Sequence, residues 1–376
     1  MKNKKRVLLV NVQPLRRGGA QAVIMSIVRN LSDEFCFDIA LFSGEAGWYD
    51  EEFLSYGGKI IRIPNYSGNN VFRQRADLYV RWWKNGKRLK EEILKNGPYD
   101  VIHTIVAYEA GYMLKVAKQA GIPGRIAQTL VITDIPKSKV AMRCYASAAL
   151  KAIRKYSTFL VGCTEKACAT MFGENSRLWS IIPNPYNEER FDPKAYPELT
   201  EHTVPELIQV ASYSSNKNQL FTIEVFRRIV EKFPQAKLRF VGFELEEGYL
   251  RSMMKRIEEL ELRDNVAFYP SDADIPQLMS KSSYFLLPSV NEGFGIVLVE
   301  AQALGLRCMV SDSVPRLPDC GGCTFVPLGN AYDQWANAIL EDFEATKGLR
   351  SPYDCERFKE ASVLKEYRQM YRNGRV

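Results

Sequence analysis

The sequence predicts an α/β protein with two doubly wound, Rossmann-like domains. Short apolar runs alternate with helical patterns along the chain, which is typical of parallel sheets covered by helices. The chain has 376 residues, more than one hydrophobic core normally serves, and a polar, proline-rich stretch from Pro183 to Pro205 divides it near the middle. We expect the two domains to face each other across a ligand cleft at the carboxyl ends of their strands.

Strand candidates in the first half are short runs rich in apolar and β-branched residues. They cover Arg6–Asn11, Phe37–Phe42, Lys59–Ile63, Val101–Ile105, Arg125–Leu130, Phe159–Cys163 and Ser180–Ile182. The residues between most of these runs follow helical periodicity. The clearest helices are Gln21–Leu31, Glu109–Gln119 and Glu165–Phe172.

The second half repeats this alternation after the proline-rich stretch. We therefore predict one domain over residues 1–185 and a second over residues 186–351. The tail, residues 352–376, is predicted to be a helix that packs back toward the N-terminal domain. Strands are predicted at Leu207–Ala211, Lys237–Val241, Val266–Tyr269, Tyr284–Pro288, Arg307–Ser311 and Cys323–Val326, and helices at Leu220–Lys232, Tyr249–Glu259, Ile275–Lys281 and around Glu300.

The composition, 46% hydrophobic and 25% charged residues, is that of a soluble globular protein. No apolar run approaches the roughly 20 residues that cross a bilayer, and Val7–Val12 is too short for a signal peptide, so we expect a cytoplasmic protein. The net charge is +7, and basic residues gather in Arg73–Lys95, which contains Trp82 and Trp83, and in Lys137–Lys155. These stretches fit either solvated helix faces or a peripheral contact with the anionic inner face of the cell membrane. No motif for nucleic-acid binding accompanies them.

Cysteine and histidine usage argues against disulfide and metal chemistry. The eight cysteines lack the regular spacing of a disulfide framework. Cys320 and Cys323 form one CxxC pair without a second pair or a nearby histidine, so reduced cysteines in a turn are favoured over a zinc or redox site. The chain has two histidines, His103 and His202, which excludes a histidine-rich metal site. We expect no metal and no cofactor.

The most informative segment is Pro288–Gly305. A strand-like run leads into the Gly-x-Gly loop Gly293–Gly295, which opens a helix. Glycines let backbone N–H groups approach a ligand, and a helix start carries unpaired donors and a positive dipole end, so this loop suits phosphate. Glu292 and Glu300 flank the loop. On one straight helix they would lie roughly 12 Å apart, which is too far for an acid/base pair but suits the two ends of a nucleotide sugar.

Three other patches carry candidate ligand groups. Gly18 and Gly19 end the loop after the first strand, where Rossmann-like domains bind ligands, although paired glycines are often only turn residues. Lys217 and Asn218 follow the first strand of the second half, where a lysine would reach phosphates held by the glycine loop. Without the other motifs, the simplest interpretation of Lys217 would be an ordinary exposed lysine in a loop. His103 lies in an apolar strand, where a hydrogen-bonded core histidine competes with a site residue.

The order of these motifs resembles the retaining glycosyltransferases of family 4, which have the GT-B fold. The resemblance covers nearly the whole chain. Leu287–Pro315 is its most specific part and is similar to the branch that builds capsular and extracellular polysaccharides. The motifs that carry it are Gly18-Gly19, Asp100-Val-Ile-His103, Ile182-Pro-Asn-Pro185, Lys217-Asn218 and Glu292-Gly-Phe-Gly295 with Glu300.

This resemblance implies a hexosyltransferase that takes a nucleotide-diphosphate sugar as donor, needs no metal, and acts on a lipid-linked or oligosaccharide acceptor. It implies that Glu292 contacts the transferred sugar, that Glu300 binds the ribose hydroxyls, and that Lys217 binds the phosphates. The implied donor-binding set also includes Gly293, Phe294, Gly295, Asn218 and Tyr269, while Gly18, Gly19 and His103 would serve the acceptor side or a phosphate loop.

The chain departs from the family pattern at three positions, one of which is Ile105, where a second histidine is expected after His103. Ser212 and its neighbours replace the usual arginine before the lysine, and Gln128 lies where the family tends to carry a histidine. A missing arginine on a leaving diphosphate could cost about 2–4 kcal/mol unless Arg16, Arg17 or Lys166 replaced it. Two alternatives stay open: a catalytically impaired sugar-nucleotide-binding or scaffold relative in a polysaccharide assembly complex, and a GT-B nucleotide-sugar epimerase, for which the chain has few histidines.

Overall fold

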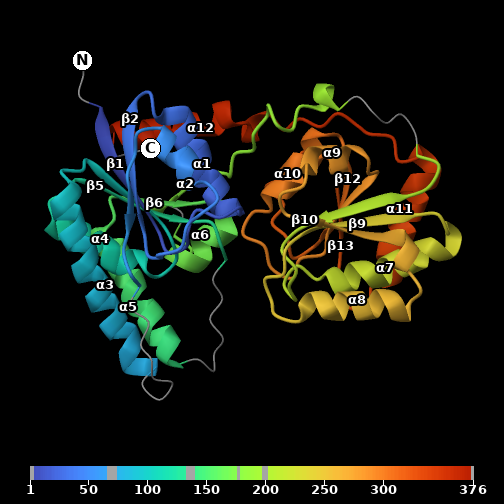
Figure 1. Cartoon of the computed structure of the whole chain (residues 1–376), viewed down its shortest axis with the longest axis horizontal. Coiled ribbons are helices and arrows are strands. Elements are labelled where there is room, and N and C mark those ends of the chain that lie inside the picture. Colours follow the sequence, from blue (N-terminus) through green and yellow to red (C-terminus); the bar gives the residue numbers. More distant parts are fainter. Residues whose placement is uncertain (1–3, 66–73, 133–139, 176–177, 197–201, 374–376) are drawn as a thin grey trace. The chain divides into compact units, whose positions relative to one another are not determined.

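A computed structural model of the chain divides into two compact units. Unit 1 comprises Met1–Pro185 together with Glu360–Val376, and unit 2 comprises Tyr186–Lys359. Each unit contains one parallel sheet with helices packed on it (Figure 1). The predicted fold class, an α/β protein with two doubly wound sheets, is confirmed. The structure describes residues 4–65, 74–132, 140–175, 178–196 and 202–373.

The described part of unit 1 forms a seven-stranded parallel sheet in the order β3-β2-β1-β4-β5-β6-β7. From β1 the chain moves outward to β3 and then returns to β4 on the other side of β1. The strand order therefore reverses between β1 and β4, which is where doubly wound sheets open a crevice for ligands. The strands are β1 (Lys5–Asn11), β2 (Phe35–Leu41), β3 (Ile60–Arg62), β4 (Val101–Ile105), β5 (Gly124–Thr129), β6 (Phe159–Gly162) and β7 (Ser180–Ile181).

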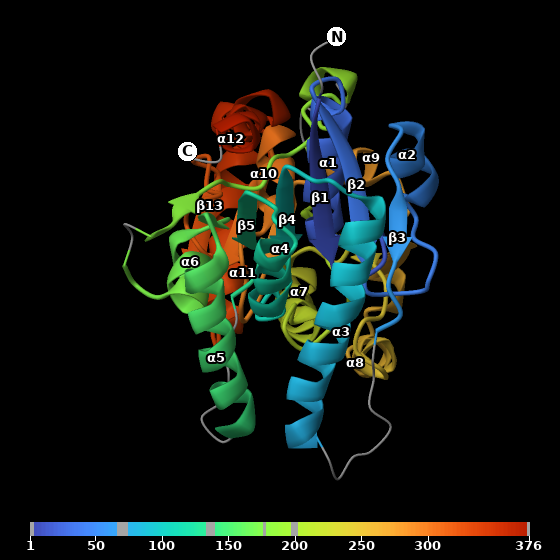
Figure 2. The ribbon, with the colours of Figure 1, turned by 90° about the vertical axis from the view of Figure 1, so that its left-hand side faces the viewer.

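Helices cover both faces of this sheet. One face packs against α3, α4, α5 and α6, and α4 lies between α3 and α5 (Figure 2). The other face packs against α1, α2 and α12, so the last helix of the chain is part of the core of unit 1. The helices are α1 (Gly19–Leu31), α2 (Asp50–Ser55), α3 (Gln74–Asn96), α4 (Ala110–Gln119), α5 (Val140–Tyr156), α6 (Glu165–Phe172) and α12 (Glu360–Asn373).

The described part of unit 2 forms a six-stranded parallel sheet in the order β10-β9-β8-β11-β12-β13, which reverses between β8 and β11. The strands are β8 (Glu206–Val210), β9 (Lys237–Gly242), β10 (Val266–Pro270), β11 (Tyr284–Leu287), β12 (Arg307–Ser311) and β13 (Cys323–Val326). The helices are α7 (Gln219–Lys232), α8 (Tyr249–Glu259), α9 (Ile275–Ser280), α10 (Ile296–Ala303) and α11 (Tyr332–Thr346).

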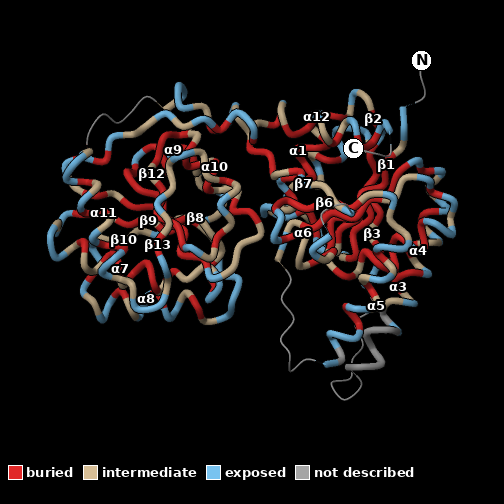
Figure 3. The backbone as a smooth tube through the Cα atoms, turned by 180° about the vertical axis from the view of Figure 1, so that it is seen from behind, coloured by how far each residue is buried: buried red, intermediate tan, exposed pale blue. Residues whose placement is uncertain are grey.

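The central strands are buried on both faces, as Figure 3 shows for each unit. All four residues of β11 are fully buried, and so are Val7–Val10 of β1. This explains why the two strands read as continuous apolar runs instead of alternating patterns. Such strands place polar side chains only beyond their ends, so ligand groups are expected in the loops that follow them.

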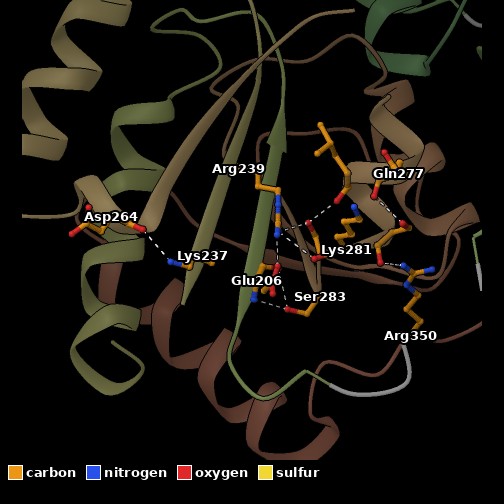
Figure 4. Close-up of polar contacts among 11 residues, drawn as sticks. Glu206, Lys237, Arg239, Asp264, Gln277, Lys281, Ser283 and Arg350 are labelled. Atoms are coloured by element: carbon orange, nitrogen blue, oxygen red, sulfur yellow. Dashed lines mark hydrogen bonds and ion pairs between the residues drawn. The ribbon is translucent and has the colours of Figure 1, made fainter. Parts of the chain in front are cut away.

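A polar cluster ties β8, β9 and the α9–β11 connection together at the amino-terminal end of the unit 2 sheet (Figure 4). Arg239 forms an ion pair with Glu206 and donates to the carbonyl oxygen of Lys281 at 3.1 Å. The Ser283 hydroxyl accepts from the Glu206 backbone N–H at 2.9 Å, and Arg350 donates to the carbonyl oxygen of Ser280. These contacts lie at the strand ends opposite to the loops that carry Lys217 and Glu292. They anchor the sheet, so its other end is held in a defined geometry.

Most predicted elements match the structure within two residues, but the C-terminal helix begins at Glu360 and not at residue 352. The preceding residues belong to unit 2. Tyr353 packs against Gly322, Phe358 is fully buried against Phe294, and the carbonyl oxygen of Phe358 accepts from the backbone N–H of Tyr186 at 2.9 Å. A helix through this segment would remove those contacts.

Candidate functional site

The loops that carry Lys217 and Glu292 are neighbours in unit 2. The first follows β8 and the second follows β11, and these two strands pair directly where the strand order reverses. The carboxyl ends of parallel strands meet at the same edge, so both loops lie at the crevice of the sheet. The fold thus brings together two predicted patches that are about 75 residues apart in sequence.

Asn216 and Asn291 fasten the two loops to each other. The Asn216 amide donates to the carbonyl oxygen of Asn291 at 2.9 Å, and its side-chain oxygen accepts from the backbone N–H of Asn291 at 3.1 Å. The backbone N–H of Val290 also donates to the carbonyl oxygen of Asn216 at 2.9 Å. These three bonds fix the backbones directly before Lys217 and Glu292.

Lys217 and Glu292 form an ion pair between Nζ and Oε2. Their side chains are 23% and 15% exposed, so both are accessible from one side. The backbone of Lys217 is held by Gln209, whose amide donates to the Lys217 carbonyl oxygen at 2.8 Å. The ammonium group is therefore presented beside a carboxylate, next to the start of α10.

The glycine loop ends where α10 begins, at Ile296. Gly295 has φ +84°, a left-handed conformation that side chains disfavour, so glycine is required there. Phe294 is 1% exposed because its ring packs against Phe358 at a centroid distance of 5.7 Å. Only the backbone of this loop is available to a ligand, and the unpaired N–H groups of the helix start suit an anion.

Glu300 lies in the second turn of α10, while Glu292 precedes the helix. The straight-helix separation used for the sequence estimate therefore does not apply to this pair. Glu300 is half-buried, and burial raises its pKa to about 7, although the charge of Arg190 acts in the opposite direction. A carboxyl group with this pKa exchanges its proton near neutral pH and accepts hydrogen bonds from hydroxyls best when ionised.

Asn218 and Tyr269 lie at different distances along the chain and sheet from the Lys217–Glu292 ion pair. Asn218 has φ +58° and precedes α7 without capping it through its side chain, so its amide is left to other partners. Tyr269 is half-buried on the edge strand β10, which β9 separates from β8. The structure thus brings Asn218 beside Lys217 and leaves Tyr269 two strands away.

His103 belongs to the core of unit 1. It is 0% exposed in β4, and its Nδ1 lies 2.7 Å from the hydroxyl of Tyr371 in α12. Burial lowers its pKa to about 3, so the ring is neutral at physiological pH. No face of the ring reaches solvent, so these contacts favour the core interpretation, and a role of His103 on the acceptor side or in a phosphate loop stays a prediction.

Gln128 lies in the same part of the unit 1 core. It is buried in β5, and its amide donates to the hydroxyl of Tyr367 in α12 at 2.6 Å. Where the family pattern led us to expect a loop histidine, the chain has a side chain that binds α12. The departure at Gln128 therefore concerns helix packing in unit 1, as does the contact of His103 with Tyr371.

Gly18 and Gly19 start α1 directly after the loop that follows β1. Neither has positive φ, and the space around Gly19 is open, so the backbone does not require glycine at these positions. Arg17 stacks on Trp48 at 3.9 Å and Arg16 pairs with Glu45. Gly18 and Gly19 thus form an accessible helix start at the crevice of unit 1.

The CxxC pair contacts cysteines outside the motif. Cys320 Sγ lies 2.7 Å from Cys355 Sγ, while Cys323 is the register partner of Cys308 on the neighbouring strand. All of these cysteines are free thiols. Within the described residues, no three His, Cys, Asp or Glu side chains are grouped to hold a metal ion. None of the described helices has the length and apolar character of a membrane span.

Comparison with known proteins identifies the chain. Residues 194–320, in unit 2, match the family model "Glycosyl transferases group 1". Over 362 residues, 93% of this chain and 90% of the relative, the sequence is 26% identical to the putative glycosyltransferase EpsF of Bacillus subtilis. Residues 194–320 are thus assigned to the group 1 glycosyltransferases, the family that the order of motifs resembles.

Other similarities extend over most of the chain. An Escherichia coli relative, UDP-Gal:alpha-D-GlcNAc-diphosphoundecaprenol alpha-1,3-galactosyltransferase, is 24% identical over 335 residues, covering 82% of this chain and 80% of its own. The crystal structure of Anabaena HepE in complex with UDP and glucose has a TM-score of 0.75 and 18% identity, covering 98% of this chain and 99% of its own. The fold of the chain is thus GT-B, as the resemblance implied.

Sequence reasoning missed the group that influences Glu300. Arg190 is exposed in the turn after Tyr186 and acts electrostatically on the Glu300 carboxylate. Nothing in the local pattern distinguishes Arg190 from an ordinary surface arginine, since its place beside α10 depends on the fold.

Proposed function

We propose that the chain is a retaining, metal-independent transferase that moves a hexose-type sugar from a nucleotide-diphosphate donor to a lipid-linked or oligosaccharide acceptor in cell-surface polysaccharide synthesis. The observation that carries the proposal is the Lys217–Glu292 pair beside the start of α10. It offers one cation, one carboxylate and the backbone N–H groups of a helix start within a single crevice. The names of the similar proteins support the substrate classes, since one relative acts on a diphosphoundecaprenol-linked sugar and one neighbour was solved with UDP and glucose.

In this proposal the donor diphosphate binds Lys217 and the backbone N–H groups of Gly293–Gly295. Glu292 accepts hydrogen bonds from hydroxyls of the transferred sugar, and Glu300 accepts them from the ribose. Asn218 and Tyr269 contribute further donor contacts, and Gly18 and Gly19 serve the acceptor side. The positive groups neutralise charge that develops on the leaving diphosphate, which is the main way that such a site lowers the barrier.

In this proposal, configuration is retained because the acceptor hydroxyl attacks the anomeric carbon from the face that the diphosphate leaves. The bond between the anomeric carbon and the phosphate oxygen breaks as the new glycosidic bond forms. The hydroxyl proton passes to the departing phosphate oxygen, so the reaction needs no separate carboxylate base. This fits a crevice in which Glu292 is occupied with positioning the sugar.

The test offers the purified protein a panel of UDP-, GDP- and dTDP-linked hexoses with and without EDTA. Binding and acceptor-dependent transfer that survive EDTA would support the proposal. Absence of binding to every donor, or strict dependence on a divalent ion, would overturn it. Interconversion of a donor without any acceptor would indicate the epimerase alternative.

A second candidate is a sugar-nucleotide-binding relative without turnover. Ser212 motivates it, because the arginine expected there is absent and its carbonyl oxygen is occupied by the Gln219 amide at 2.9 Å. This candidate predicts donor binding with no transfer to any acceptor and no loss of donor over time.

We also propose that unit 1 contacts an anionic membrane surface through exposed residues of α3 and α5. In Figure 2 the N-terminal turns of both helices extend beyond the carboxyl ends of the strands. Val140 (61% exposed) and the exposed cation Arg143 lie in the first turn of α5, and Trp83 (68% exposed) and the exposed cation Lys87 lie near the middle of α3. Apolar side chains flanked by lysine and arginine suit the headgroup region of a bilayer. Arg73 and residues 137–139 of the predicted basic stretches lie outside the described residues.

A further inference from the structure

Two pairs of cysteines lie in unit 2 around the CxxC motif. Cys320 precedes β13 and Cys323 is its first residue, and the fold gives each of them a partner from elsewhere in the chain. The S–H group of Cys355 donates to Sγ of Cys320 at 2.7 Å. Cys323 is the register partner of Cys308 on the neighbouring strand β12. The two cysteines of the motif therefore contact partners outside it.

Helix α10 holds the loops that carry Cys320 and Cys355. The side chain of Gln302, fully buried in this helix, donates to the carbonyl oxygen of Pro318 at 2.9 Å and accepts from the backbone N–H of Cys320 at 2.7 Å. The Cys355 sulfur lies 3.9 Å from the carbonyl oxygen of Val299, also in α10. Both sulfur atoms are thus positioned by the same helix.

Arg357 joins the two loops directly. Its guanidinium group donates to the carbonyl oxygen of Leu317 at 2.7 Å and to that of Asp319 at 3.0 Å. These acceptors lie just before Cys320 in the chain, and Arg357 follows Cys355 by two residues. Because these contacts already hold the loops together, a bond between the two sulfur atoms requires little movement of the backbone.

The two thiols differ in their access to solvent. Cys320 is half-buried, whereas Cys355 is 4% exposed. The contact with Cys320 and burial raise the pKa of the Cys355 thiol above its ordinary value, so Cys355 keeps its proton at neutral pH. A small reagent from solvent therefore meets Cys320 first, and Cys355 is in place to react with the product.

We propose that Cys320 and Cys355 form a site of reversible oxidation by a low-molecular-weight disulfide, and that the bond fastens the segment before α12 to unit 2. The Cys320 sulfur attacks one sulfur of the small disulfide, whose S–S bond breaks, and one half leaves as a thiol with the Cys320 proton. Cys355 then gives up its proton and attacks Sγ of Cys320, which releases the other half as a thiol. Two protein thiols are oxidised to one disulfide, and the small disulfide is reduced to two thiols.

The pair of Cys308 and Cys323 is the competing site, and its chemistry is less favourable. Cys308 is 1% exposed, so a reagent would have to react with the half-buried Cys323. The contact with Cys308 and burial raise the pKa of the Cys323 thiol above its ordinary value. The accessible member of this pair is thus kept protonated, and a protonated thiol is a poor nucleophile.

The bond between Cys320 and Cys355 would join residues 35 positions apart. A cross-link of this kind stabilises a protein mainly by restricting the unfolded chain. It would also hold the segment that carries Phe358, whose ring packs against Phe294 of the glycine loop. The inference concerns unit 2 alone and does not depend on sugar transfer.

The experiment incubates the full, reduced chain with oxidised and reduced glutathione in graded ratios. The remaining thiols are blocked with N-ethylmaleimide, and the disulfides are mapped by mass spectrometry without reduction. We expect a cross-link between Cys320 and Cys355 that dithiothreitol reverses. The cross-linked chain should unfold at a temperature about 5–10 °C above that of the reduced chain.

Cys355→Ser should stop at a mixed disulfide of Cys320 with glutathione and should not gain thermal stability on oxidation. Cys320→Ser removes the same bond at a half-buried position, so it tests the inference even where the buried variant fails to fold. Cys144→Ser, which removes an exposed cysteine of α5, is the matched control and should behave like the parent chain.

Three results overturn the inference. In the first, the exposed cysteines react with glutathione while Cys320 and Cys355 stay reduced or carry glutathione separately. In the second, the chain forms a bond between Cys308 and Cys323 and none between Cys320 and Cys355. In the third, the chain is cross-linked at Cys320 and Cys355 but unfolds at the same temperature as the reduced chain.

Discussion

Lys217 and Glu292 neutralise each other across the two loops at the crevice of unit 2. A donor that binds there must separate them, because its diphosphate competes for the ammonium group and its sugar hydroxyls compete for the carboxylate. Both groups exchange one polar partner for another, so neither is left unpaired. The bonds of Asn216 with Asn291 keep the loops together during this exchange.

Replacing Lys217 by methionine should weaken UDP binding about 10- to 100-fold, since a charge-assisted hydrogen bond to phosphate contributes about 1.5–3 kcal/mol. Isothermal titration calorimetry measures the change. Lys232→Met, at the exposed far end of α7, is the matched control and should bind UDP normally. Equal affinities of the two variants for UDP would show that Lys217 does not bind the phosphates.

Glu292→Gln should preserve UDP affinity and reduce sugar transfer by at least about 100-fold, because the carboxylate acts on the sugar at the transition state. Initial rates with a saturating donor, together with UDP titration, separate the two effects. Glu247→Gln, at an exposed position after β9, is the control. A fully active Glu292→Gln enzyme would contradict the assigned role.

The pH dependence of UDP binding should report Glu300. Its raised pKa, about 7 without ligand, means that the carboxyl group becomes protonated as pH falls below 7 and then accepts ribose hydrogen bonds poorly. We expect the affinity to fall about tenfold between pH 8 and pH 6. Glu300→Gln should bind more weakly at pH 8 and show a flat profile. A profile equally steep in the variant would assign the titration to another group.

Tyr371→Phe should destabilise unit 1 by about 1–3 kcal/mol, because it leaves the buried His103 Nδ1 without its partner. Thermal unfolding detects the loss, while UDP affinity should stay unchanged. The control Tyr56→Phe alters an exposed tyrosine of the same unit. A Tyr371→Phe variant with normal stability and weakened donor binding would indicate that His103 contributes to ligand binding.

Trp83→Ser should reduce binding to vesicles that contain phosphatidylglycerol about tenfold, since burying a large apolar side chain contributes roughly 1.5–3 kcal/mol. Co-sedimentation with the vesicles measures it. Leu54→Ser, on the exposed face of α2, should bind like the parent chain. Identical binding of both variants would exclude the α3 surface as the contact.

The sequence predicted the parts of the fold and site that depend on local pattern. The strands at the centre of both sheets were recognisable as apolar runs. The loop before α10 was recognisable because its left-handed backbone at position 295 favours glycine, which the sequence shows there. Lys217 and Glu292 could be paired in advance, because topology alone places the ends of β8 and β11 together.

The remaining features depend on packing between distant residues. Cys320 and Cys355 are 35 positions apart, and the CxxC spacing points to Cys323 as the partner, so the sequence does not indicate their contact. His103 fits two interpretations, and only the position of α12 favours one of them.

The position of α12 in unit 1 also determines the order in which the two units can be completed during synthesis on the ribosome. Unit 1 uses both ends of the chain, so the face of its sheet around Phe35 and Phe37 stays uncovered until Tyr371 emerges from the ribosome. Unit 2 is encoded without interruption and is complete earlier. Unit 1 can therefore be completed only after unit 2, the reverse of the usual N-terminal-first order, and the nascent N-terminal half exposes apolar surface for longer.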